Sequence, residues 1–434
     1  MELLLLCMAA LVITILIGVP IPFAFFAGTL TIILAGGYSD FTFLLPYAYK
    51  QSASIILMAI PLFIFAGSLM EKGGIGEALI NLVEMFIGKL KGGLGPVMVV
   101  ACGIFGAISG SGMATLSCIG SILLPRMFAA GYPRGWCCAL ISSASLLGLL
   151  IPPSLNMILY AFVGGQSVLA CFFATVIPGI ILICLFSLTF LFFVRKDPNI
   201  QVVQSWQGSY VKQLGKRTGR AIPAIISPLI ILGGIYSGIM TPTEAAAISV
   251  IYSIPVGFFI YKGLNLKRFK ASLVESGTTA GVIMLMIFSI SMLARLFVME
   301  DVPNTILNAL LSISDNPKVL VLFINLFLII IGMIMDDTSA ILLTTPILLP
   351  VATALGIDPI HYAAIIGVNL GLGCVTPPCA PFLYLGSRVG GTPVSEMLKP
   401  TMWIILCCWL PALIVTTYIP ELSLFLPRAM GLIA

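Results

Sequence analysis

The sequence of 434 residues has few charged residues and a single histidine. Lysine, arginine, aspartate and glutamate together make up 9% of the chain, whereas a soluble protein carries about 25%. Hydrophobic residues make up 60%, and apolar stretches long enough to cross about 30 Å of hydrocarbon recur from end to end. The composition therefore excludes a soluble domain and predicts an all-α polytopic membrane protein. The alternating ten-residue segments of a membrane β-barrel are absent from the sequence.

The scarcity of histidine also argues against a metalloenzyme. The eleven cysteines lie almost wholly inside apolar segments, and none has metal-ligand spacing with His361. We interpret them as small apolar residues. The adjacent Asp336 and Asp337 have no second acidic cluster with which to hold a metal and a diphosphate. The sequence therefore indicates that the chain is not an enzyme, and its net charge of +5 is explained by topology rather than by a nucleic-acid partner.

The two halves of the chain resemble each other on either side of the polar stretch 195–220. The segment "SILLPRMFAAGYPRGW" (121–136) matches "PILLPVATALGIDPIHY" (346–362), and "GLLIPPSLNMILYAFVGG" (148–165) matches "GCVTPPCAPFLYLGSRVGG" (373–391). Internal duplication is typical of secondary transporters. We therefore predict two repeats, 1–194 and 221–434, joined by a cytoplasmic linker at 195–220.

The basic residues predict how the repeats are oriented. If 96–129 and 319–354 are re-entrant hairpins, almost every basic cluster falls on one side, which the positive-inside rule assigns to the cytoplasm. These clusters are Lys89 and Lys91, Arg126, Arg134, Arg195 and Lys196, Lys212–Arg220, Lys262–Lys270, Arg388 and Lys399. The first repeat then crosses the membrane five times, so the second runs inverted and both termini lie in the periplasm.

Two kinds of helix break occur in both repeats. The hairpin tips read "SGSGMAT" (109–115) and "MDDTSA" (335–340), and Pro-Pro pairs break the next helix in "LLIPPSLN" (149–156) and "GCVTPPCAP" (373–381). Consecutive prolines remove amide donors and disfavour the helical conformation before them, so nearby carbonyls should be free. Free carbonyls and hydroxyls in a water-poor pocket suit Na⁺, and the helix N-termini after the tips attract an anion.

We therefore predict two Na⁺ sites that flank an organic anion at mid-membrane. The first site comprises Ser109, Gly110, Ser111, Thr115, Ile151, Pro152 and Asn156. The second comprises Met335, Asp337, Thr338, Ser339, Gly373, Val375 and Thr376. The anion is expected to contact Ser111, Gly112, Ser154, Thr338, Asn369 and Pro378. No organic cofactor is expected.

Simpler roles remain open for some of these residues. Gly110 and Gly112 could serve only the close packing of helices. Asp337, Thr338 or Ser339 could be the N-cap of a helix that begins at Ala340, a role that is compatible with ion binding. Of the two adjacent acids, we expect Asp337 to face the site.

Several stretches resemble the large membrane subunit of the TRAP transporters, the tripartite ATP-independent periplasmic carriers. They are "GGIYSGIMTPTEAAAISVIY" (233–252), "IPLFIFAGSLMEKGG" (60–74), "SGSGMATLSCIGSILLPRMFAAGYPR" (109–134), "LLIPPS" (149–154) and "MDDTSAILLTTPILLP" (335–350). The resemblance covers essentially the whole chain. It implies Na⁺-driven import of a carboxylate or acidic sugar through the bacterial inner membrane by an elevator mechanism. It also implies two partners, a small four-helix membrane subunit and a periplasmic substrate-binding protein.

The same resemblance implies roles for the predicted segments. In repeat one, it implies scaffold spans at 2–70 and an arm at 75–90, followed by the hairpin 96–129, the broken helix 135–163 and a span at 169–194. In repeat two, it implies scaffold spans at 221–298 and an arm at 303–314, followed by the hairpin 319–354, the broken helix 360–387 and a span at 399–419. A binding-protein-independent anion symporter and, from a different class, a membrane-embedded enzyme are the alternatives.

Overall fold

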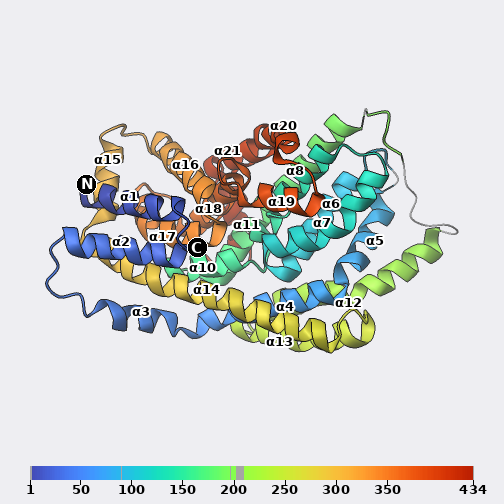
Figure 1. Ribbon diagram of the computed structural model, residues 1–434, viewed down its shortest axis with the longest axis horizontal. Helices are drawn as coiled ribbons and strands as arrows, with labels where there is room; N and C mark the ends of the chain where they lie inside the picture. The colour runs from blue at the N-terminus through green and yellow to red at the C-terminus, as the bar shows by residue number, and fades with distance from the viewer. Residues whose placement is uncertain (1, 89, 196, 202–209, 434) are drawn as a thin grey trace.

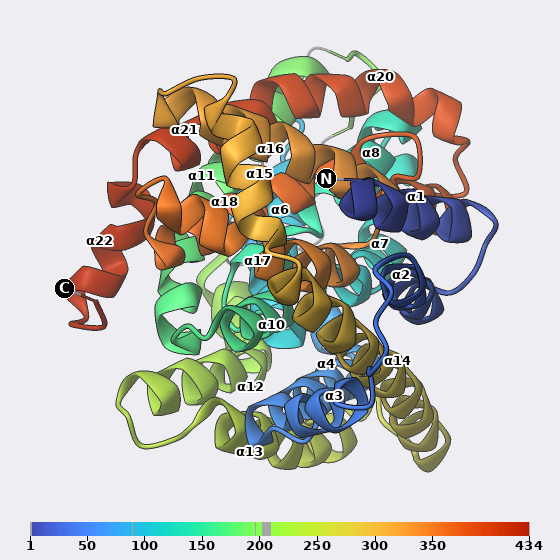
Figure 2. The same ribbon diagram turned by 90° about the vertical axis from the view of Figure 1, so that its left-hand side faces the viewer.

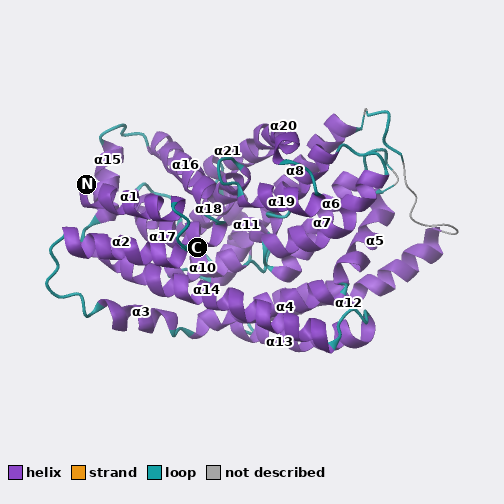
Figure 3. Ribbon diagram, in the orientation of Figure 1, coloured by secondary structure: helices purple, strands orange, loops and turns teal. Residues whose placement is uncertain are grey.

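The computed structural model describes residues 2–88, 90–195, 197–201 and 210–433. The predicted linker 195–220 and arm 75–90 therefore lie partly outside the described residues. Within these ranges every regular element is a helix and no strand occurs (Figure 3). The predicted all-α fold class is confirmed.

The helices in the first half of the chain range from four to 27 residues in length. They are α1 (Glu2–Leu16), α2 (Ile21–Ala35), α3 (Leu44–Ser52), η1 (Ile55–Met58), α4 (Ala59–Gly73), α5 (Ile75–Ile87), α6 (Leu94–Ser109), α7 (Gly112–Ala129), α8 (Arg134–Ala144), α9 (Leu147–Leu150), α10 (Leu155–Gly164) and α11 (Val168–Val194).

The second half begins with a helix that the polar composition of 195–220 did not predict. Helix α12 starts at Tyr210 because Lys, Gln, Leu and Arg, which favour helix, follow it without a proline until Pro223. The half comprises α12 (Tyr210–Tyr236), α13 (Pro242–Pro255), η2 (Val256–Ile260), α14 (Leu266–Met299), α15 (Val302–Leu311), α16 (Pro317–Ile334), α17 (Asp337–Ala354), α18 (Pro359–Val375), α19 (Pro381–Gly390), α20 (Val394–Ile404), η3 (Ile405–Trp409), α21 (Leu410–Tyr418) and α22 (Glu421–Ala429).

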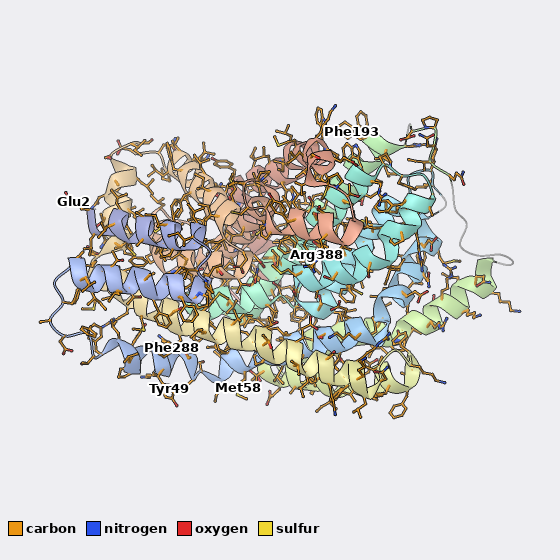
Figure 4. The ribbon with its side chains drawn as sticks, viewed as in Figure 1. Glu2, Tyr49, Met58, Phe193, Phe288 and Arg388 are labelled. Atoms are coloured by element: carbon orange, nitrogen blue, oxygen red, sulfur yellow. The ribbon has the colours of Figure 1, made fainter. Side chains whose placement is uncertain are left out.

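The length and composition of these helices suit a membrane. Among the described residues, nine helices are long and apolar enough to cross a bilayer, or ten if 134–164, bent by 46°, is counted as one broken span. Large apolar side chains also remain exposed, and Figure 4 shows Tyr49 and Met58 pointing outward from one edge of the bundle. Exposed apolar surface of this extent is expected where a protein faces lipid.

The helices form two layers, and both halves of the sequence contribute to each. Helices α3, α4, α12, α13 and α14 lie together along one edge (Figures 1 and 2), and α4 packs against both α13 and α14. In the other layer α10 packs on α17, α8 on α20, and α7 on α19. The functional site can therefore be assembled from segments far apart in the sequence.

Glycine pairs bring the hairpins against the broken helices. A Cβ atom at Gly106 of α6 would lie 2.5 Å from the Cα atom of Gly148 in α9. In the second half, a Cβ at Gly373 of α18 would lie 2.6 Å from the Cα of Gly332 in α16. Because the neighbouring atoms are backbone, they cannot rotate away, and the helices can approach this closely only with glycine at positions 106 and 373.

This packing generates a test of stability. We expect Gly373→Ala and Gly106→Ala each to destabilise the protein by about 1–3 kcal/mol, because the added methyl group overlaps backbone. Gly281→Ala in α14 is the control, since a Cβ there meets no atom within 4 Å. Thermal unfolding in detergent should give a lower midpoint for the first two variants. Midpoints equal to that of the control would contradict the packing.

Candidate functional site

A cavity of about 480 Å³ lies between the two layers, where the tips of both hairpins meet. The first tip contributes residues 109–114 and the second contributes residues 336–338. Asn156 of α10 also lines it, and helices α4 and α14 form the opposite wall. The two predicted tips therefore share one site, although Ser109 of the first tip and Asp336 of the second are 227 positions apart in the sequence.

The first tip exists because α6 ends at a residue that tolerates a left-handed backbone. Gly110 has φ of +63°, a conformation that costs glycine little. The chain then turns into α7 through Ser111, whose hydroxyl accepts the Ala114 amide at 3.5 Å as an N-cap. The break is thus built from glycine and a capping serine, residue types suited to these positions.

Buried oxygen atoms cluster at this first tip. The hydroxyls of Ser109 and Thr115 lie 3.2 Å apart, and Thr115 also donates to the Ser111 carbonyl at 2.8 Å. Ser109 and Thr115 are almost fully buried. The cluster offers neutral oxygen donors of the kind that a desolvated alkali cation prefers.

The second tip carries two carboxylates with different surroundings. Asp336 is the N-cap of α17, where it accepts hydrogen bonds from the Ser339 amide, at 3.3 Å, and from the Ser339 hydroxyl. The expectation that Asp337, Thr338 or Ser339 caps this helix is therefore wrong. The helix begins at Asp337, because a capping side chain must come directly before the first helical residue.

Asp337 is buried beside Asn156, which comes from the other half of the chain. The Asn156 side-chain amide donates to the Asp337 carboxylate at 2.6 Å, and the Thr338 hydroxyl donates to the Asn156 carbonyl at 3.4 Å. Asn156 was predicted to serve the first site, but its hydrogen bonds join it to the second tip. It therefore links the two predicted sites.

The Pro-Pro breaks lie behind the tips. Both pairs, Pro152–Pro153 and Pro377–Pro378, have a cis peptide bond. Some carbonyls that were predicted to be free have partners: Ser154 donates to Leu149 at 2.6 Å, and the Thr376 amide donates to Gly373 at 2.9 Å. The Gly110 carbonyl likewise accepts the Leu155 amide at 3.3 Å, which joins the first tip to the start of α10.

The predicted site residues fall into two groups. Those that line the cavity are Ser109, Gly110, Ser111, Gly112, Asn156, Asp337 and Thr338. Those that do not line it are Thr115, Ile151, Pro152, Ser154, Met335, Ser339, Asn369, Gly373, Val375, Thr376 and Pro378. Gly112 also has a packing role, since a Cβ there would lie 2.8 Å from the Phe382 ring.

Asn369 lies in a separate buried network. Its side-chain amide donates to Asn325 at 3.0 Å, and Asn325 donates to Thr417 at 3.0 Å. These contacts join α16, α18 and α21 away from the cavity. The structure thus shows a helix-joining contact for Asn369, while its predicted contact with the anion stays a prediction.

The wall opposite the tips contains polar residues that sequence reasoning missed. Ser68 and Glu71 lie on α4, and Glu275, Ser276 and Thr279 lie on α14. Their spacing of three or four residues puts them on one face of each apolar helix, which could have marked that face as a cavity wall.

The cavity has an unusual charge balance. Four carboxylates line it, those of Glu71, Glu275, Asp336 and Asp337, but no lysine or arginine does in the part of the chain that the structure describes. Lys72, which follows Glu71 in α4, forms an ion pair of 2.5 Å with Glu275. The described residues contain no cluster of three or more His, Cys, Asp or Glu side chains of the kind that holds a transition metal.

A polar cavity between broken helices in a polytopic helical protein is typical of membrane transporters. Residues 7–422 match the family model described as "Tripartite ATP-independent periplasmic transporter, DctM component". The chain belongs to this family and is a TRAP transporter large membrane subunit.

The names of its relatives refer to different organic anions. It is 36% identical over 389 residues to the C4-dicarboxylate TRAP transporter large permease protein DctM of Pseudomonas aeruginosa, covering 88% of this chain and 89% of that one. It is 31% identical over 411 residues to the sialic acid permease SiaM of Vibrio cholerae, covering 95% of each. These relatives are named as transport permeases and not as enzymes, as the sequence predicts.

Two further comparisons concern chain length and fold. The chain is 33% identical over 413 residues to the isethionate permease DctMQ of Oleidesulfovibrio alaskensis, covering 94% of this chain but only 64% of that longer relative. The crystal structure of the Alcanivorax borkumensis YdaH transporter matches with a TM-score of 0.58 at 15% identity, covering 86% of this chain and 87% of that one. This likeness concerns the fold alone.

The hydrogen bond between Asn156 and Asp337 can be tested by substitution. We expect Asn156→Ala to lower uptake about 10- to 100-fold, since a hydrogen bond to a buried charged group contributes about 1.5–3 kcal/mol. Asn304→Ala, at an exposed position on α15, is the control and should leave uptake unchanged. Initial uptake rates in reconstituted vesicles measure both. A wild-type rate for Asn156→Ala would show that the link is dispensable.

Proposed function

We propose that this chain is the large subunit of a Na⁺-coupled transporter that imports an organic anion with the help of a binding protein. The observation that carries the proposal is the cavity shared by both tips, lined by four carboxylates and, among the described residues, by no basic side chain. A site with this charge can hold an anion only when cations enter with it. Na⁺ fits the hydroxyl and carboxylate oxygens present, which are hard ligands.

The size of the electrostatic effect decides how strong the coupling would be. Two unit charges about 5 Å apart repel by about 3 kcal/mol at an effective dielectric constant of about 20. This repulsion weakens the affinity for an anion by about two orders of magnitude. Na⁺ bound at Asp337 removes the repulsion, so the anion and the cation each favour the binding of the other.

The remaining features of the cavity suit an anion once the carboxylates are neutralised. Helices α7 and α17 begin at the two tips, and a helix N-terminus carries a positive partial charge that attracts an anion. The hydroxyls of Ser111 and Thr338 add donors to this lining. A volume of about 480 Å³ accommodates a small organic acid.

The architecture supports an elevator mechanism within this proposal. The hairpins and broken helices share one layer, and α3, α4 and α12–α14 share the other (Figures 1 and 2). Glycine pairs hold each hairpin to its broken helix, so the tips and the breaks can move as one body past the wall of α4 and α14. The predicted inverted repeats give this body its two opposed hairpins.

The partners follow from the family. We propose that a small membrane subunit and a periplasmic substrate-binding protein act with the chain at the bacterial inner membrane, with both termini in the periplasm. The C4-dicarboxylate, sialic acid and isethionate named for the relatives support organic acids as the substrate class.

Reconstitution tests the whole proposal. The chain, its small subunit and its binding protein are placed in vesicles, and uptake of a C4-dicarboxylate, sialic acid and isethionate is measured with and without an inward Na⁺ gradient. We expect Na⁺-dependent accumulation of one acid that requires the binding protein. Accumulation driven equally by a pH gradient or membrane potential without Na⁺ would contradict Na⁺ coupling. Uptake unchanged without the binding protein would favour the binding-protein-independent symporter.

The two adjacent aspartates provide a matched pair of variants. We expect Asp337→Asn to abolish Na⁺-driven accumulation, because it removes the buried charge that Na⁺ neutralises. Asp336→Asn should retain most of the uptake, since asparagine is also a good N-cap. The Na⁺ dependence of uptake measures both variants. Equal, full activity in both variants would show that neither carboxylate is needed for Na⁺ coupling.

A further inference from the structure

A second cavity, lined by basic residues, lies between the arm helix α5 and the start of α12. A cavity of about 170 Å³ is lined there by Ala78 and Asn81 of α5 and by Gln213, Lys216, Arg217 and Arg220 of α12. The start of α12 lies at the right-hand end of the molecule in Figure 1. The distribution of basic residues predicts that this end faces the cytoplasm.

The charges at this cavity are only partly compensated within the protein. Arg217 donates to the Asn81 carbonyl at 2.8 Å and pairs with Glu84 at 3.8 Å, which offsets the Glu84 charge. In the described part of the chain, no carboxylate lines the cavity, and no hydrogen bond or ion pair engages the side chain of Lys216 or Arg220. Two positive charges are therefore left to bind an anion from outside.

Exposed apolar side chains on or just beyond the two helices that line the cavity indicate the source of that anion. Phe86 near the end of α5 is 64% exposed, Leu90 just beyond it is 56% exposed, and Ile222 of α12 is 46% exposed. A free phosphate ion would gain nothing from contact with these apolar side chains. A phospholipid would place its phosphate at the basic residues and its acyl chains along the apolar ones, as basic pockets at the cytoplasmic membrane surface do.

We propose that this cavity binds the phosphodiester headgroup of an anionic phospholipid of the inner leaflet, with Lys216 and Arg220 as its ligands. Bound there, the lipid would lie beside a polar contact between the arm and a hairpin. The Asn81 side-chain carbonyl accepts a hydrogen bond from Arg126 of α7 at 3.2 Å. The lipid site thus adjoins the arm where it contacts both layers. This proposal does not depend on Na⁺ coupling or on the identity of the transported acid.

Lipid binding to the full-length chain tests the proposal. The purified protein in detergent is titrated with phosphatidylglycerol or phosphatidylcholine, and binding is followed by native mass spectrometry and by thermal unfolding. We expect phosphatidylglycerol, but not phosphatidylcholine, to bind and to raise the unfolding midpoint. The double variant Lys216→Gln/Arg220→Gln should weaken this affinity about thirtyfold, which is about 2 kcal/mol.

The control variant is Lys270→Gln/Arg388→Gln, which removes one lysine and one arginine that are exposed, predicted cytoplasmic and outside the cavity. It should bind phosphatidylglycerol like the wild type. Equal loss of affinity in both double variants, or no loss in either, would overturn the site. If inorganic phosphate raises the unfolding midpoint as much as the lipid does, the ligand of this cavity is a soluble anion and not a lipid. All four substituted side chains are exposed, so the variants should fold.

Discussion

The rest of the site depends on one constraint. A carboxylate is buried inside the membrane protein, and its nearest polar partner is an amide and not a cation. Asp337 is 7% exposed and accepts a hydrogen bond from Asn156, and among the described residues no lysine or arginine lines the cavity around it. Such a group must be neutralised before an anion can lie beside it. In our proposal Na⁺ supplies this neutralisation, which turns an unfavourable charge into the source of coupling.

The fold places this charge where the two hairpin tips meet. Left-handed Gly110 and the capping residues Ser111 and Asp336 end and restart the hairpin helices where the cavity begins. Asn156, supplied by the first half of the chain, reaches the tip supplied by the second half. Neither half can build the site alone, because the carboxylate and its hydrogen-bond donor come from different halves.

The local chemistry of the tips made them predictable from the sequence, whereas the tertiary contacts could not be predicted from it. The glycines, serines and aspartates of the tips interrupt apolar runs, so both tips were located. Both carboxylates line the cavity, and the expectation that Asp337 rather than Asp336 faces the site stays a prediction. The sequence did not indicate that Asn156 contacts the second tip, because its partner is 181 positions away. Asn369 looked equally suited to a site, yet it joins helices, since polar residues within membrane helices also serve packing. The wall residues Glu71 and Glu275 were missed because single polar residues on apolar helices look unremarkable until the helices are placed.

The central claim is that Na⁺ binds at Asp337, so Na⁺ should bind to the protein even when no anion is present. Thermal unfolding of the purified protein, measured during a titration with Na⁺ and without any organic acid, tests it most directly. The account predicts a saturable rise in the unfolding midpoint with Na⁺ that choline at equal ionic strength does not produce, and that Asp337→Asn removes. The same midpoint in Na⁺ and choline, with stabilisation only after an organic acid is added, would contradict it.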